Sequence, residues 1–208
     1  MKVYHARNTR SLRILWLLEE LGLPYDVEIF DLGAPEMRSE AYRKVHPMGR
    51  VPALQDGEVI LHESGAIVEY VLARHGAGRL VPEVSDKAFP AYLQWLHYAE
   101  GMMMPQVNLI MVETRFLPPE KQNPTNLARA QKLLAKSLDA VEGGLAGKDY
   151  LAGEFSGADI MTGHACHAAE SLGIPMEALP NTAAYVARLR ARPPLLRPRE
   201  EETPCAAA

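Results

Sequence analysis

Hydrophobic positions in the first thirty residues follow two different periods, and each period predicts a different element. Residues 2–5 are mostly apolar, as in a short strand. Over residues 10–21 apolar side chains recur every three or four positions, which predicts an amphipathic helix that ends at Gly22. Residues 25–30 alternate through Val27 and Ile29, the period of a second strand. A helix between two strands makes a βαβ unit, whose strands are normally parallel with a right-handed crossover.

A second set of elements follows within the next fifty residues. Residues 36–45 are more polar and predict a short helix or an irregular segment. Residues 51–54 and 59–61 read as short strands, and Asp56-Gly57 between them is a strong hairpin signal. Ser64 is expected to cap a helix that Gly76 ends. A βαβ unit followed by a ββα unit is the thioredoxin-like arrangement.

The rest of the chain shows no strand pattern. Helices are predicted over residues 91–111, 125–145 and 181–191, and another begins at Ser156, where Asp159 completes a variant of the capping box. We therefore expect an α/β thioredoxin-like N-terminal domain over residues 1–80, a linker over residues 81–87, and an all-α C-terminal helical domain over residues 88–197. The proline- and glutamate-rich tail, residues 198–208, is expected to be disordered.

Composition and charge narrow the class of protein. The 208 residues carry a formal net charge of −4, which argues against a general nucleic-acid binder. Two cysteines, Cys166 and Cys205, give neither a disulfide framework nor a zinc spacing, so we expect no metal and a reducing, cytoplasmic environment. No apolar stretch approaches the roughly 20 residues needed to cross a bilayer, so no membrane association is expected.

Three motifs bring in a family resemblance. The run HPMGRVPAL, then DG, then LHESGAIVEYV resembles the "NPxGxVPxL…ES.AI..YL" signature of glutathione transferases. Farther on, LAGEFSGADIM resembles the family motif "L.G..fs.ADi", and YVARLRARP resembles a late helix of the family. The motifs cover nearly the whole chain in the family's order. The chain is therefore identified as a member of the glutathione S-transferase superfamily.

The resemblance implies an activity and its partners. The implied function is conjugation of the glutathione thiol to small hydrophobic electrophiles in detoxification, or glutathione-dependent peroxidase or thiol-reductase activity. Glutathione would be a co-substrate, with no further cofactor, and the protein would be a two-fold homodimer. The alternative is a non-catalytic binding or regulatory protein with the same fold.

The pair Glu63-Ser64 is the strongest candidate for ligand binding. A helix N-terminus presents free amides and the positive end of the helix dipole, so it favours anions. Ser64 can give its hydroxyl and amide to the γ-glutamyl carboxylate of glutathione, and Glu63 can accept the adjacent α-ammonium. The simpler interpretation is that Ser64 only caps the helix.

Two further glutathione contacts are expected just before the third strand. The resemblance implies that Pro52 is a cis-proline and that the backbone of Val51 binds the cysteinyl part of glutathione. A proline that merely shapes the entry to a strand is the alternative. Arg50 is predicted to reach the glycyl carboxylate, and a solvated surface arginine is the alternative.

The thiol-activating residue is expected in the turn after the first strand. A thiol with a pKa near 8.5 needs a hydrogen-bond donor, and helix-dipole help, to become the nucleophilic thiolate. The segment aligns with the bacterial beta-class pattern, with Arg10 at the place of its cysteine and Ser11 at its serine. His5 falls where many relatives carry tyrosine. We predict Ser11, then Thr9, as the catalytic residue, with Asn8 still open; the alternative is that these hydroxyls only cap the helix.

The remaining candidates are arginines and methionines. Arg7, Arg10 and Arg13 are unusual near a helix N-terminus, and we expect at least one, with Arg10 as the choice, to face the carboxylates of glutathione. Solvated arginines or ion pairs with nearby glutamates are the alternative. Met103 and Met104 are predicted to line an adaptable electrophile pocket, unless they belong to the ordinary core.

Overall fold

The computed structural model describes residues 1–202, which divide into two compact units. The first unit comprises Met1–Leu80 together with the C-terminal segment that starts at Arg190, and the second unit is Val81–Leu189. Each unit is described by itself below.

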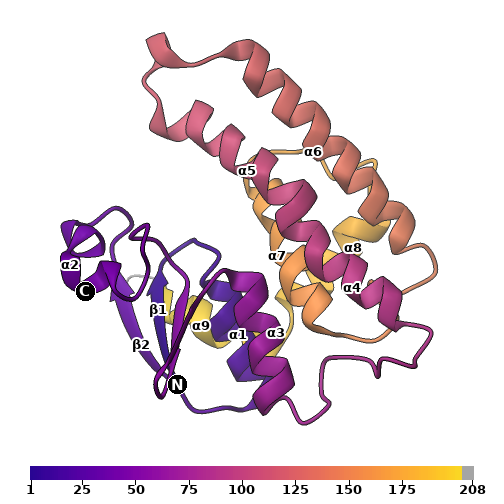
Figure 1. Ribbon diagram of the computed structural model, residues 1–208. Helices are drawn as coiled ribbons and strands as arrows, with labels where there is room; N and C mark the ends of the chain where they lie inside the picture. Colours follow the sequence, from indigo (N-terminus) through magenta and orange to yellow (C-terminus); the bar gives the residue numbers. More distant parts are fainter. Residues whose placement is uncertain (203–208) are drawn as a thin grey trace, which may run out of the picture. The chain divides into compact units, whose positions relative to one another are not determined.

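A four-stranded mixed sheet forms the centre of the first unit (Figure 1). Its strands are β1 (Lys2–Ala6), β2 (Asp26–Phe30), β3 (Ala53–Asp56) and β4 (Val59–His62), in the order β2-β1-β3-β4. Strands β1 and β2 are parallel and are joined by helix α1 (Leu12–Leu21), whereas β3 is antiparallel to both β1 and β4. The predicted βαβ and hairpin units are therefore confirmed.

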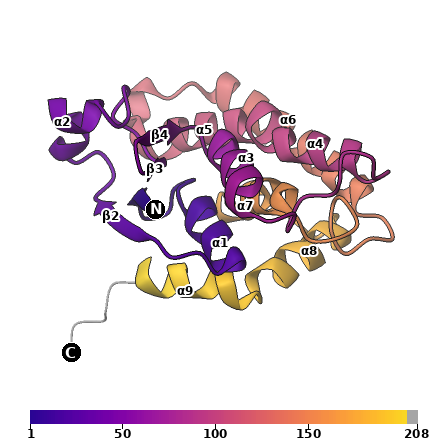
Figure 2. The same ribbon diagram turned by 60° about the horizontal axis from the view of Figure 1, so that its bottom comes forward.

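Helices cover both faces of this sheet. Helix α1 and helix α3 (Ser64–His75) lie on one side, and the 3-10 turn η1 (Pro35–Arg38) and the short helix α2 (Glu40–Arg43) lie on the other (Figures 1 and 2). Side chains alternate between the faces of a strand. Tyr4 of β1 thus meets α2, where its ring lies 6.5 Å from that of Phe30 and 5.6 Å from that of Tyr42. This aromatic cluster is the part of the core that underlies the segment before β3.

The second unit is helical throughout. Its elements are α4 (Phe89–Tyr98), η2 (Ala99–Met103), α5 (Met104–Met111), η3 (Val112–Phe116), η4 (Pro119–Lys121), α6 (Pro124–Gly144), α7 (Gly157–Ser171) and α8 (Pro180–Arg190). The helix predicted over residues 91–111 is interrupted by η2 and continues into η3, both π-helical turns. The predicted fold class, thioredoxin-like followed by all-α, is confirmed.

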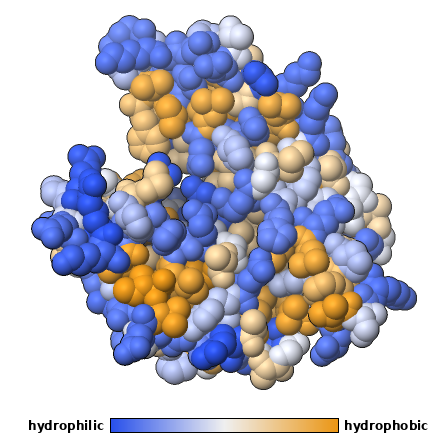
Figure 3. Space-filling model, viewed as in Figure 1, coloured by the Kyte–Doolittle hydropathy of each residue, from blue (hydrophilic) through white to orange (hydrophobic). Residues whose placement is uncertain are grey.

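The surface of the second unit carries exposed hydrophobic side chains as well as charge. In the view of Figure 3, hydrophobic residues gather where Figure 1 draws α5, and Val112 and Phe116 of the adjoining η3 are 40% and 61% exposed. Among the helices of the described residues, none has the length and apolar character needed to span a membrane.

The end of the chain differs from the expectation of a disordered tail. Helix α9 (Pro193–Glu202) follows α8 directly, belongs to the first unit and lies along α1 (Figure 2). Prolines at 193 and 194 therefore end one helix and begin the next, since proline is favoured in a first helical turn. The helical domain ends near residue 189 rather than 197, and residues 203–208 of the expected tail lie outside the described residues.

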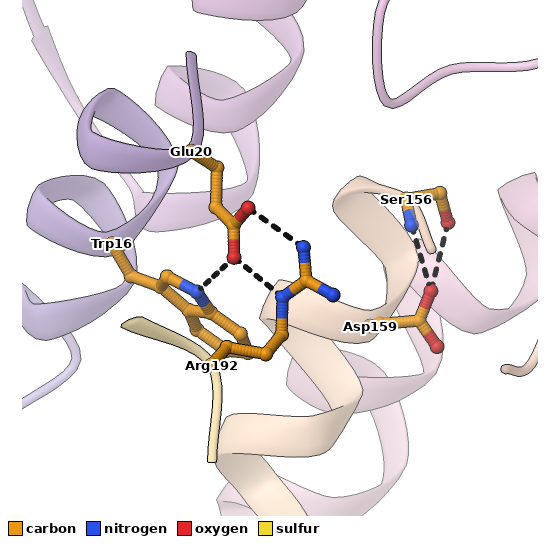
Figure 4. A network of polar contacts seen from close by, with 5 residues as sticks. All are labelled: Trp16, Glu20, Ser156, Asp159 and Arg192. Carbon is orange, nitrogen blue, oxygen red and sulfur yellow. Dashed lines mark hydrogen bonds and ion pairs between the residues drawn. The ribbon is translucent and has the colours of Figure 1, made fainter. Parts of the chain in front are cut away.

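Two polar networks fix helix ends within the units (Figure 4). In the first unit, the carboxylate of Glu20 accepts hydrogen bonds from the Trp16 indole at 2.9 Å and from Arg192 at 2.6 and 2.8 Å. In the second unit, the Asp159 carboxylate accepts from the amide and hydroxyl of Ser156 at 2.9 and 3.1 Å. The predicted capping box at the start of α7 is confirmed.

Candidate functional site

The strand register of the first unit brings the predicted ligand-binding residues to one edge of the sheet. Ala53 pairs with His62, and continuing that register by one residue places Pro52 opposite Glu63. One position farther in the same direction, Val51 and Ser64 follow. Tyr4 of β1 also pairs with Ala53, so the turn after β1 begins at the same edge. The peptide bond between Val51 and Pro52 is cis, as the family resemblance implied.

The backbone of Val51 is open for a ligand. Its side chain is half-buried and packs against the aromatic cluster of Tyr4, Phe30 and Tyr42. Among residues 1–202, neither its N–H nor its C=O has a hydrogen-bond partner. A peptide group in this state can pair with the backbone of a bound peptide, in the way that adjacent strands pair.

Glu63 adopts a backbone conformation that L-residues avoid. Its φ of 72° and ψ of 113° lie outside the usual regions for a residue with a Cβ atom. Such strain persists where the surrounding structure enforces it, and it is concentrated at functional sites. The side chain is exposed, and within the described part of the chain its carboxylate forms no ion pair or hydrogen bond. The carboxylate is therefore available to an ammonium group.

The N-terminus of α3 lies directly after this strained residue. The cap position is Glu63, and Ser64 is the first helical residue, so the expectation that Ser64 caps the helix is wrong. Amides at the start of a helix lack intrahelical acceptors and attract anions. The Ser64 hydroxyl instead accepts a hydrogen bond from the guanidinium of Arg13 at 2.9 Å. Its own proton thus stays available for an anionic ligand.

Arg13 is a residue whose position the sequence left open. It lies inside α1 with no exposed surface and brings a positive charge behind Ser64. The sequence did contain a sign of this burial: Arg13 lies within the apolar run of that helix, where a side chain points into the protein. Of the three first-turn arginines, this one contacts a predicted glutathione-binding residue; Arg10 is half-buried, and its predicted role stays a prediction.

The hydroxyls of Ser11 and Thr9, which were predicted to activate the thiol, form hydrogen bonds to other residues of β1 and of the turn that follows it. Ser11 has no exposed surface, and its Oγ lies 2.8 Å from His5 Nδ1, 2.6 Å from Thr9 Oγ1 and 3.2 Å from the Ala6 amide that donates to it. Thr9 in turn donates to the carbonyl of Ala6 at 2.7 Å. In one arrangement that fits these distances, His5 donates to Ser11, Ser11 donates to Thr9, and Thr9 donates to the Ala6 carbonyl. Neither hydroxyl then has a proton left to donate to a ligand.

This network gives Ser11 and Thr9 a structural role in the turn. Ser11 is buried, and Thr9 is half-buried and donates its proton to Ala6, so their predicted catalytic role stays a prediction that these contacts disfavour. Ser11 does not serve as a side-chain cap of α1 either, because its hydroxyl faces β1. Asn8, beside them, is exposed with a φ of 58°, and its side-chain amide has no partner among residues 1–202.

Charge near the site is mixed. Arg50 is exposed, and within the described residues its guanidinium forms no ion pair. His46, 4.9 Å from His62 between ring centroids, has its pKa lowered by burial and then by His62, whereas Glu63 opposes the shift. The site thus combines one exposed carboxylate with cationic and amide donors, which suits a zwitterion.

In the second unit, Met103 and Met104 are both buried, and Met102 is the exposed member of that run. Their role in an electrophile pocket stays a prediction. Among residues 1–202, no group of three or more His, Cys, Asp or Glu side chains is arranged to hold a metal ion.

Comparison with known proteins agrees with this arrangement. The family model for the glutathione S-transferase N-terminal domain matches residues 1–73, and the model for the C-terminal domain matches residues 124–188. Glutathione S-transferase 3 of Schizosaccharomyces pombe is 30% identical over 76% of this chain and 69% of its own length. Glutathione S-transferase 4 of Zea mays is 32% identical over 87% of this chain and 83% of its own length.

A solved structure extends the likeness to three dimensions. A sphingomonad glutathione S-transferase complexed with glutathione has a TM-score of 0.82 and 27% identity, covering 97% of this chain and 98% of the other. The fold and the edge site define a thioredoxin-like domain that is fused to an all-helical domain. The chain belongs to the glutathione S-transferase family.

Proposed function

We propose that this protein is an enzyme that binds glutathione at the edge site and transfers its thiol to small apolar electrophiles. The thiolate attacks an electrophilic carbon, a leaving group departs with its electron pair, and the thiol proton passes to solvent. Glutathione is a co-substrate in this reaction. Detoxification in a reducing cytoplasm, where glutathione is held as the thiol, is the setting that fits this chemistry.

The observation that carries the proposal is the set of unused polar groups at one sheet edge. Val51 offers an unpaired N–H and C=O, Glu63 an exposed carboxylate, and Ser64 a hydroxyl proton beside the amides of α3. These groups match a γ-glutamyl zwitterion followed by a peptide backbone. A ligand with an amino-acid end and a peptide backbone could pair with all of these groups at once.

Asn8 is the residue that we assign to the thiol. Its amide is a donor, it is exposed, and it occupies the turn where a thiolate would also gain from the N-terminus of α1. A hydrogen bond to a charged partner contributes about 1.5–3 kcal/mol, so its loss should lower kcat/KM by about 10- to 100-fold. The same bond would lower the pKa of the bound thiol.

Calorimetric titration with glutathione tests binding, and formation of a thioether with 1-chloro-2,4-dinitrobenzene tests turnover. Wild-type protein should bind glutathione, and Glu63→Gln should bind it more weakly. Asn8→Gly removes the side chain and tolerates the positive φ, so it should lower turnover and leave the turn intact. Arg7→Ala, an exposed neighbour in the same turn, is the matched control. No heat at millimolar glutathione would exclude the proposal.

The non-catalytic alternative also has an observation in its favour, the engagement of both Ser11 and Thr9 inside the turn. A protein that binds glutathione but turns over neither the aryl halide nor an organic hydroperoxide would be a binding or regulatory member of the fold. Activity with the hydroperoxide alone would replace conjugation by a peroxidase function.

The proposal includes a homodimer. Val112 and Phe116 leave large apolar areas exposed near α5, and contiguous apolar surface is a feature of interaction sites. Light scattering should give twice the chain mass of 23.0 kDa, and Phe116→Ser should shift the equilibrium toward the monomer. A monomer at micromolar concentration would refute the dimer and leave the enzymatic proposal unaffected.

A further inference from the structure

The side chain of Tyr42 is attached to the loop that carries Val51. Tyr42 lies in α2, whose first turn Ser39 caps by accepting from the Tyr42 amide at 3.1 Å. Its ring is buried and lies 4.7 Å from that of Phe30 and 5.6 Å from that of Tyr4. Its hydroxyl donates to the carbonyl oxygen of Arg50 at 2.7 Å. A rigid aromatic cluster therefore holds one peptide group eight residues farther along the chain.

That hydrogen bond determines the direction of the next amide. Among the described residues the cis peptide bond is the one between Val51 and Pro52, so the preceding bond between Arg50 and Val51 is trans. In a trans peptide the C=O and the N–H point in opposite directions. Because the Arg50 carbonyl is directed toward the buried Tyr42 hydroxyl, the Val51 N–H is directed away from the cluster. This is the amide that has no partner among residues 1–202.

The Val51 side chain reinforces this orientation. It packs against the same cluster of Tyr4, Phe30 and Tyr42. The residue is thus held from two sides, by its own side chain and by the carbonyl before it, while its backbone N–H and C=O stay open. A binding group held in this way needs less ordering when a ligand arrives, which favours affinity.

We propose that Tyr42 is a positioning residue of the glutathione site, which holds the Val51 peptide group in the orientation that binds the cysteinyl backbone of glutathione. The inference rests on the proposed function, because it concerns the same ligand. Tyr42 acts through Val51 and touches neither the ligand nor the thiol.

The chemistry of Tyr42 suits this role over a wide range of pH. Burial, followed by the neighbouring Tyr4 and Glu28, raises the pKa of the Tyr42 phenol well above its usual value. The hydroxyl therefore keeps its proton and remains a donor to the Arg50 carbonyl in alkaline buffers, where the glutathione thiol itself ionises.

Tyr42→Phe tests the proposal, with Tyr4→Phe as the matched control. Both variants remove one buried hydroxyl from the same cluster, but the Tyr4 hydroxyl donates to the side chain of Gln55 at 3.1 Å and not to the loop. Tyr42→Phe should raise the KM and the calorimetric Kd for glutathione by about five- to tenfold, the effect of one hydrogen bond. At saturating glutathione, kcat should stay within about twofold of wild type.

A second measurement separates positioning from a loss of stability. Amide hydrogen exchange of Val51 without ligand should change in Tyr42→Phe and not in Tyr4→Phe, and urea unfolding of both variants should show similar midpoints. Equal affinities in wild type and Tyr42→Phe would overturn the positioning role but leave the proposed function standing. If wild type binds no glutathione, the proposed function fails and this inference fails with it.

Discussion

A largely buried ion pair joins the residue before α9 to α1, and its burial gives a quantitative prediction. Glu20 of α1 and Arg192, just before α9, form a bidentate pair at 2.6 and 2.8 Å (Figure 4). A second arginine, Arg197 of α9, contacts Glu19 at 3.1 Å. We expect Arg192→Ala to destabilise the first unit strongly and Arg197→Ala to have a small effect.

The magnitudes follow from exposure. The Glu20 side chain is 6% exposed and that of Arg192 is 25% exposed, whereas that of Arg197 is 75% exposed. Removing one partner of a buried ion pair costs about 3–5 kcal/mol, because the remaining charge stays desolvated. Since water reaches part of the Arg192 side chain, we expect the lower end, about 3 kcal/mol. The exposed pair of Arg197 contributes at most about 1 kcal/mol.

Urea unfolding measured by tryptophan fluorescence distinguishes these values. The chain has two tryptophans, Trp16 in the first unit and Trp95 in the second, so a Trp95→Phe background makes the signal specific for the first unit. With an m-value of about 1–3 kcal/mol per molar urea, Arg192→Ala should lower the midpoint by about 1–3 M. Equal losses in the two arginine variants, or a loss below about 1 kcal/mol in Arg192→Ala, would refute the reasoning.

Three further predictions concern single positions. Gly143→Ala, where a Cβ meets open space in α6, should stabilise the chain by about 0.5–1 kcal/mol in thermal unfolding, whereas Gly144→Ala should destabilise it, because its Cβ would collide with the ring of Trp95. Burial tends to raise the pKa of Glu142, but four hydrogen bonds from the first turn of α8 outweigh burial and lower the pKa. Its contribution is therefore complete above the unfolded pKa and lost as pH falls through the folded one, so Glu142→Gln should flatten the acid limb of a stability–pH curve. Glu63→Gly should relieve backbone strain and stabilise the free protein by about 1 kcal/mol while weakening glutathione binding, whereas Glu63→Gln should weaken binding without this gain.

Elements whose signals are local were predictable from the sequence. The Asp56-Gly57 turn lies where the hairpin was expected, since Gly57 adopts the positive φ of 61° that such a turn requires. The Ser156 box is local as well, because its partner is three residues away. The cis bond before Pro52 followed from the family motif and not from any local pattern.

Partners that lie far apart in the sequence were not predictable. The tail from residue 198 is rich in proline and charge, so its composition suggested disorder, yet residues 198–202 continue helix α9, in which Leu195 is buried. Arg192, just before α9, pairs with a glutamate 172 residues earlier. For Ser11, the sequence showed a hydroxyl at the start of a helix, but it did not show that this hydroxyl is directed toward β1. Its hydrogen-bond partner, His5, becomes a neighbour only once β1 and α1 are packed together.

Two segments of the first unit form the proposed ligand site: the turn that contains Asn8, and the start of α3 at Glu63. Glu63 and Asn8 both have positive φ, and a strained residue of this kind costs on the order of 1–3 kcal/mol. Such a cost is tolerated only where neighbouring contacts hold the backbone, and the hydroxyls of Ser11 and Thr9 provide such contacts directly beside Asn8. Loss of the Ser11 hydroxyl should therefore reduce stability first and affect glutathione only through the turn, whereas loss of the Asn8 side chain should act on the thiol directly. Ser11 and Thr9, which the sequence offered as partners of the thiol, thus support the turn that carries Asn8.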